Sequence, residues 1–145
     1  MESTFTGEYL HSIDAKGRVI VPAKFRESLG ETFMITMGLD GCLSMYSNDE
    51  WNGFVEKLRM LPETRKEARA LRRHFLARAA LCEVDKQGRV LIPVKLREHA
   101  GFTKDIVFVG MLSKVEIWSK ERWDEVDLND MDDAAEKLAE FGIEL

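Results

Sequence analysis

Two arginines stand directly after the glycine of a phrase that the chain spells twice. The sequence of 145 residues reads DAKGRVIVPAKFRESLG from Asp14 and DKQGRVLIPVKLREHAG from Asp85, and nine of these seventeen positions are identical. A guanidinium on a short turn can enter the major groove of DNA and donate two hydrogen bonds to O6 and N7 of guanine. We therefore take Arg18 and Arg89 as the candidate base-reading residues.

Other basic residues recur in or beside the same phrase. Lysine has no preferred base geometry, so a lysine here would mainly hold phosphate and make binding sensitive to salt. The further candidate DNA contacts are Lys16, Lys24, Arg26, Lys86, Lys95 and Arg97. In the second copy Gln87 occupies the place of Lys16, so the two copies need not contact DNA equally.

The other shared residues have an ordinary structural explanation. The aspartate is expected to cap a turn, the glycine to supply its positive φ, and the proline to open a helix. These turn residues are Asp14, Gly17 and Pro22 in the first copy and Asp85, Gly88 and Pro93 in the second. The explanation does not account for the arginine that follows the glycine in both copies.

The phrase belongs to a longer repeat, in which the expected order of elements is strand, strand, helix, strand, strand, helix. The two modules span 7–54 and 79–126, with linking helices over 55–78 and an acidic helix over 127–145. The runs RVIVP and RVLIP predict buried strands. A module of this size buries too little surface to fold alone, so we expect the two copies to complete one core. The predicted fold class is α+β with a mainly β core.

Two segments outside the repeat have the apolar spacing of amphipathic helices. They read LPETRKEARALRRHFLARAA and MDDAAEKLAEFG, and they suggest surfaces for self-association. The basic helix over 65–78 could be a second DNA surface or a solvated face. Its positive charges surround much of its circumference, which favours the solvated face.

The net charge of −5 hides an uneven distribution. From Glu116 to Leu145 there are 11 acidic and 3 basic residues, whereas the preceding residues include 18 basic and 15 acidic ones. An acidic tail on a locally basic body is compatible with DNA binding, because phosphates respond to the local potential.

Enzymatic motifs are missing from the sequence. The three histidines and two cysteines have no metal-ligand spacing, and no G-x-S-x-G elbow or glycine-rich phosphate loop occurs. We therefore predict no catalytic residue, no metal and no cofactor. The N-terminus lacks a secretory signal and no apolar run is long enough to span a membrane, so a cytoplasmic location is expected.

The doubled phrases Asp14–Arg18 and Asp85–Arg89, set in GRVIVP and GRVLIP, resemble the MraZ family of bacterial regulators. The segments FTGEYLHSID and MGLDGCL extend the resemblance over nearly the whole chain. The resemblance implies a double-split β-barrel of two SpoVT-AbrB-like modules and a ring-like homo-oligomer, with an octamer as the expected size. It also implies binding of double-stranded DNA at G-rich direct repeats upstream of the division and cell-wall gene cluster, which includes the family's own gene. The expected effect is repression, at the nucleoid.

The resemblance carries over to particular positions of this sequence. Arg18 and Arg89 match the arginine of the family phrase, and Lys16 matches its usual basic turn residue. Arg26 and Arg97 stand where AbrB-like relatives place another DNA-facing arginine. The next basic position of those relatives is occupied by Glu27 and Glu98 here.

An antitoxin-like protein-interaction module is the alternative, because AbrB-type folds also serve toxin–antitoxin pairs. Antitoxin arms are disordered until they bind. The tail MDDAAEKLAEFG has a helical apolar stripe instead, and the module is doubled within one chain. Both features favour the DNA-binding regulator.

Overall fold

The two halves of the chain contain the same order of elements. The computed structural model describes residues 4–126 and 128–145. The first module comprises β1 (Glu8–Ser12), β2 (Arg18–Ile20), α1 (Ala23–Leu29), β3 (Thr32–Met37), β4 (Leu43–Ser47) and α2 (Asn48–Arg59). The second comprises β5 (Ala80–Glu83), β6 (Arg89–Leu91), α4 (Val94–Ala100), β7 (Asp105–Gly110), β8 (Val115–Ser119) and α5 (Lys120–Asp124). Helix α3 (Lys66–Leu76) joins the modules, and α6 (Met131–Leu138) with the 3-10 turn η1 (Ala139–Phe141) follows them.

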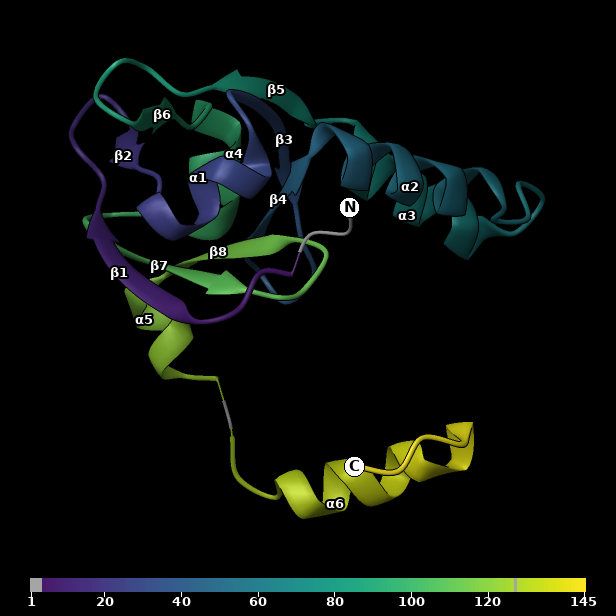
Figure 1. The fold of residues 1–145 in the computed structure, drawn as a ribbon. Helices are drawn as coiled ribbons and strands as arrows, with labels where there is room; N and C mark the ends of the chain where they lie inside the picture. Colours follow the sequence, from purple (N-terminus) through teal and green to yellow (C-terminus); the bar gives the residue numbers. More distant parts are fainter. Residues whose placement is uncertain (1–3, 127) are drawn as a thin grey trace.

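The modules exchange strands within one six-stranded antiparallel sheet of order β1-β7-β8-β4-β3-β5. Strand β1 pairs with β7 of the second module, and β5 pairs with β3 of the first. Neither module therefore has a complete sheet of its own. The predicted α+β fold of two tandem units is confirmed, and Figure 1 shows the sheet wrapping around α1 and α4.

The edge strands β1 and β5 lead through the two Asp-x-x-Gly turns into β2 and β6. These short strands pair with each other and form a two-stranded antiparallel ribbon, separate from the six-stranded sheet. Val19 lies opposite Val90, and both side chains are buried. Because side chains alternate along a strand, the neighbouring positions of the ribbon face outward.

Helices α1 and α4 fill the space under the ribbon. Phe25 and Leu29 of α1, and Leu96 and Ala100 of α4, are buried in the shared core. Pro22 and Pro93 stand at the N-cap positions, where a missing N–H costs nothing. The sheet, the ribbon and these two helices are called the β body below.

Helices α2 and α3 form a hairpin that projects from the β body on the side away from the ribbon (Figure 1). Phe54 and Phe75 meet edge to face with their ring centroids 5.0 Å apart. Near the tip, the guanidinium of Arg72 donates hydrogen bonds to the carbonyls of Leu58, Arg59 and Leu61 at 3.0–3.2 Å. These contacts join the two helices into one projecting unit.

Candidate nucleic-acid interface

Each Asp-x-x-Gly turn is closed by hydrogen bonds to its own aspartate. The N–H of Gly17 donates to the carbonyl of Asp14 at 3.0 Å, and Oδ1 of Asp14 accepts from the N–H groups of Lys16 and Arg18, both at 2.9 Å. The second turn repeats these contacts: Oδ1 of Asp85 accepts from the N–H groups of Gln87 and Arg89, both at 2.9 Å. The glycines adopt φ of +88° and +78°, the region that only glycine enters without strain.

The same aspartates orient the candidate base-reading arginines. Nε of Arg18 donates to Oδ2 of Asp14 at 2.8 Å, and Nε of Arg89 donates to Oδ2 of Asp85 at 3.0 Å. Within the described part of the chain, no hydrogen bond engages the terminal Nη1 and Nη2 atoms of either arginine. Each guanidinium is therefore held by one edge, with its two terminal nitrogens available to a ligand.

Hydrogen bonding also changes the acidity of both aspartates. The backbone N–H of Arg18 is the largest cause that lowers the pKa of Asp14, and the backbone N–H of Arg89 does the same for the pKa of Asp85. The arginine side chains add to the effect. Both carboxylates thus remain charged at neutral pH and can keep their arginines in place.

The ribbon places the two arginines on one outward face. Arg18 lies opposite Leu91, and Ile20 lies opposite Arg89. The arginines are therefore diagonal neighbours, whose Cα atoms are roughly 7–8 Å apart in an antiparallel pair. Both arginine side chains remain about one-third exposed.

Ile20 and Leu91 complete this outward face, and the sequence reasoning missed them. Their side chains are 43% and 57% exposed, although the runs RVIVP and RVLIP predicted buried strands. That prediction is correct for Val19, Val21, Val90 and Ile92, which are buried, and wrong for the alternate positions. The alternation of outward and buried positions that begins at each arginine could have indicated this exposure from the sequence. We call Arg18, Ile20, Arg89 and Leu91 the ribbon face.

Arg26 and Arg97 each support the turn of the opposite module. Nε of Arg26 donates to the carbonyl of Val21 at 2.9 Å, and the N–H of Val21 donates to the carbonyl of Gly88 at 2.9 Å. A Cβ atom added to Gly88 would lie 2.5 Å from Cζ of Arg26. The arginine thus fills the space that the missing side chain of Gly88 leaves open.

The second copy of this contact is nearly identical. Nε of Arg97 donates to the carbonyl of Ile92 at 2.8 Å, and the N–H of Ile92 donates to the carbonyl of Gly17 at 2.9 Å. A Cβ atom on Gly17 would lie 2.5 Å from Cζ of Arg97. We call the two contacts the reciprocal clasp. Both arginines are half-buried in the clasp. We therefore propose that they position the turns, whereas the family pattern suggested that they contact DNA.

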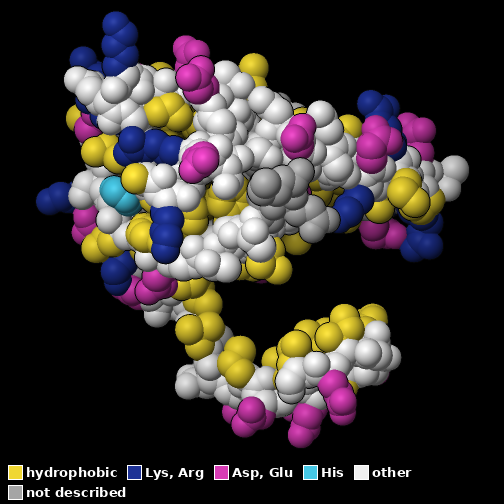
Figure 2. Space-filling model, in the orientation of Figure 1, with side chains coloured by type: hydrophobic (Ala, Val, Ile, Leu, Met, Phe, Trp, Pro, Cys, Tyr) yellow, Lys and Arg dark blue, Asp and Glu magenta, His cyan; other side chains and the backbone are white. Residues whose placement is uncertain are grey.

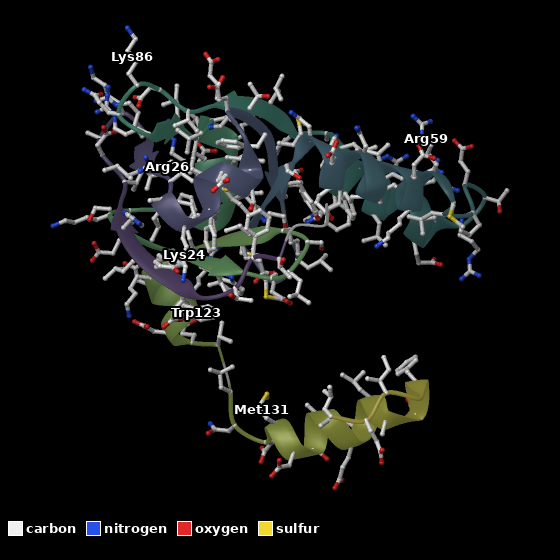
Figure 3. The ribbon with its side chains drawn as sticks, viewed as in Figure 1. Lys24, Arg26, Arg59, Lys86, Trp123 and Met131 are labelled. Carbon is white, nitrogen blue, oxygen red and sulfur yellow. The ribbon has the colours of Figure 1, made fainter. Side chains whose placement is uncertain are left out.

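The four candidate lysines are exposed, but they do not form one group. Lys16 and Lys86 lie on the two turns, next to the ribbon. Lys24 and Lys95 lie in the first turns of α1 and α4. Figure 3 shows Lys24 far from Lys86, on the part of the β body near β1. The structure therefore brings together Lys16, Lys86 and the ribbon face, and it places Lys24 apart from Lys86.

Residues 4–126 and 128–145 contain neither a recognisable metal cluster nor a membrane-spanning helix. No group of three or more histidine, cysteine or carboxylate side chains there could hold a metal ion. None of the helices in this part of the chain is both long and apolar enough to cross a membrane. The ribbon face, with its flanking lysines, is the candidate nucleic-acid interface.

Comparison with known proteins decides the family. A family model described as "MraZ protein, putative antitoxin-like" matches residues 4–74 and again residues 75–140. The chain belongs to the MraZ family. The two successive matches agree with the two modules, and the resemblance noted from the doubled phrase is confirmed.

Curated MraZ proteins align with this chain over nearly its whole length. The transcriptional regulator MraZ of Lachnoclostridium phytofermentans is 64% identical over 96% of this chain and 98% of its own. The protein of the same name from Caldanaerobacter subterraneus is 57% identical over 94% and 98%, and that of Ligilactobacillus salivarius is 52% identical over 96% and 99%. The MraZ family is thus one of transcriptional regulators and not of enzymes.

Replacing Gly88 by alanine is expected to lower the free energy of unfolding by about 1–3 kcal/mol, because alanine is strained at this φ and would clash with Arg26. Gly53→Ala is the matched control: no atom within 4 Å would meet its Cβ, and it lies inside α2. There alanine should stabilise the protein by roughly 0.5–1 kcal/mol. Urea unfolding measures the free energy of unfolding of both variants. Equal changes in the two would contradict the close contact between Gly88 and Arg26.

An NMR titration of the carboxyl resonances should give midpoints for Asp14 and Asp85 below the ordinary value for aspartate. The folded pKa is lowered, so these turns contribute stability above the unfolded pKa and lose it as the pH falls through the folded pKa. In Arg18→Ala the backbone donor remains, so the midpoint of Asp14 should stay low. If the midpoint of Asp14 returned to the ordinary value for aspartate, the lowered pKa would be due to the side chain of Arg18 instead.

Proposed function

We propose that this chain is a sequence-specific DNA-binding transcriptional regulator that reads DNA with the ribbon face. The observation that carries the proposal is the pair of outward arginines, each held at Nε by an aspartate, on one two-stranded ribbon. A two-stranded β-ribbon fits the major groove, which is about 12 Å wide. Membership of a family of transcriptional regulators supports the same role.

The chemistry of the ribbon face suits guanine next to thymine. The free Nη1 and Nη2 atoms of Arg18 and Arg89 can donate to O6 and N7 of guanine, while Ile20 and Leu91 can contact the methyl group of thymine. The two arginines are separated along the ribbon by about two base-pair steps. These features support G-rich target repeats.

The flanking lysines are proposed to hold the DNA backbone. Lys16 and Lys86 are exposed on the turns on either side of the ribbon, where they can neutralise phosphates without reading bases. Lys24 and Lys95, on α1 and α4, are proposed as more distant phosphate contacts. Because Gln87 takes the place of Lys16 in the second turn, where the lysine is Lys86 beside it, we expect the two modules to contact the backbone unequally.

One ribbon offers few contacts, so a single chain should bind weakly. We propose a ring-like homo-oligomer, with eight copies as the expected number, that presents successive ribbons to tandem direct repeats. Linking sites in this way raises affinity through effective concentration without any new contact. From the family resemblance, we propose that the repeats lie upstream of the division and cell-wall gene cluster, that binding represses it, and that the protein acts at the nucleoid.

The module bounds of 7–54 and 79–126 remain a prediction, and helix α2 (Asn48–Arg59) runs across the first of them. The second candidate function is an antitoxin-like interaction module, in keeping with the description of the MraZ family as "putative antitoxin-like". The exposed helix α6, which follows the two modules, would then be the arm that binds the partner. Failure of DNA binding by a folded oligomer would favour this candidate.

Fluorescence anisotropy with a duplex of tandem repeats from upstream of the protein's own gene tests the regulator. Arg18→Ala or Arg89→Ala should each weaken binding roughly 5- to 150-fold and reduce the preference over scrambled DNA, because one bidentate pair contributes about 1–3 kcal/mol. Lys16→Ala should weaken binding to both duplexes alike and reduce the salt dependence.

Arg65→Ala is the matched control, since this exposed arginine is paired with Glu67 and does not line the groove of the α2–α3 hairpin, which projects away from the ribbon (Figure 1). It should bind like the unchanged protein. Equal binding of repeat and scrambled DNA by the unchanged protein would contradict sequence-specific reading. A loss in Arg65→Ala as large as in Arg18→Ala would move the DNA site to the hairpin.

A further inference from the structure

Helix α6 has an apolar side that none of the described residues covers. None of its residues is buried, and it stands apart from the β body (Figure 1). Met131 and Leu138 are 50% and 53% exposed, and Phe141 beyond them is 71% exposed. Figure 2 shows apolar side chains along one edge of α6 and acidic side chains along the other. An amphipathic helix of this kind is normally stabilised by packing its apolar side.

The α2–α3 hairpin has an apolar groove that is also uncovered. The groove has a volume of about 390 Å³ and is lined by Val55, Leu58, Arg59, Arg72 and Leu76. Leu76 is 43% exposed, and Met60 near the tip of the hairpin is 83% exposed. Arg72 is held by three backbone carbonyls of the hairpin, so the groove is a built feature of the fold.

The two surfaces have opposite charge. Residues 56–78 include 8 basic and 3 acidic residues, a balance of +5, whereas residues 130–145 include 1 basic and 6 acidic residues, a balance of −5. Within the described residues, no ion pair engages Lys57, Lys66 or Arg73. The hairpin also projects away from the ribbon (Figure 1), so this charge lies on a different part of the molecule from the ribbon face.

A larger apolar groove fits α6 less well. This groove, of about 690 Å³, lies beside Trp118, Trp123 and Leu128. Its charged lining residues are Asp40, Glu116, Glu125 and Arg122. The guanidinium of Arg122 already donates to the carbonyls of Gly41 and His99. An acidic helix would meet net repulsion here and attraction at the hairpin.

We propose that α6 of one copy packs its apolar side into the α2–α3 groove of a second copy. In a single chain the two surfaces lie apart (Figure 1), so the contact joins different copies. The surfaces differ from one another, which makes the contact heterologous, and a heterologous contact that closes on itself generates a ring. This inference rests on the proposed self-association and names the surfaces that produce it.

Light scattering after gel filtration tests the contact on the full chain. The tail variant Met131→Asp/Leu138→Asp and the hairpin variant Leu76→Asp should each give the 16.6 kDa mass of one chain. Mixing the two should give a particle of two chains, because one intact tail and one intact groove remain. Leu81→Asp is the control, since this exposed leucine of β5 lies outside both surfaces, and it should keep the mass of the unchanged protein.

Circular dichroism checks the fold of each variant. If Leu76→Asp unfolds, Lys57→Glu/Lys66→Glu/Arg73→Glu replaces it, because these exposed side chains pack against nothing in the core and their reversal should also lower the mass. Variants that keep the full mass would overturn the contact, as would a mixture that stays at 16.6 kDa or an unchanged protein that is monomeric. An oligomer that depends on these residues yet ignores repeat DNA would support the contact and contradict the proposed regulator.

Discussion

The reciprocal clasp is the contact on which the rest of the structure depends. The backbone of each Gly turn is bonded to the strand of the other module, through Val21 with Gly88 and Ile92 with Gly17. Arg26 also fills the space beside Gly88, and Arg97 fills the space beside Gly17. Each arginine lies nine residues after the glycine of its own module. The ribbon therefore exists only when both modules are folded, and this constraint explains why the phrase occurs twice with so little change.

The clasp divides the basic residues by task. Arg26 and Arg97 donate hydrogen bonds to backbone carbonyls and support the turns. The aspartates of the turns instead accept from Arg18 and Arg89 and orient them. Holding Nε against a carboxylate removes much of the freedom of a long side chain before any ligand arrives. A guanidinium arranged in this way loses less conformational entropy on binding. Assembly, in contrast, is proposed to use the hairpin and the tail, at a distance from the ribbon.

Much of this site follows from local sequence. Asp14, Gly17 and Arg18 form a turn whose bonds span only a few residues, so their roles could be predicted from residue type and spacing. The alternation that exposes Ile20 is also local, but an aliphatic run bounded by proline favours a wholly buried strand. By contrast, the contact between Arg26 and Gly88 joins residues of different modules, and no spacing rule indicates it. The groove between α2 and α3 likewise depends on how two helices pack.

We propose that the ribbon from both modules forms one DNA-reading surface. The most direct test is methyl NMR of the protein titrated with a duplex of its repeats. We predict that the methyl resonances of Ile20 and Leu91 shift together at the same ratio of DNA to protein, while those of Leu76 on the hairpin stay in place. Shifts at Leu76 without shifts at Ile20 and Leu91 would contradict the account.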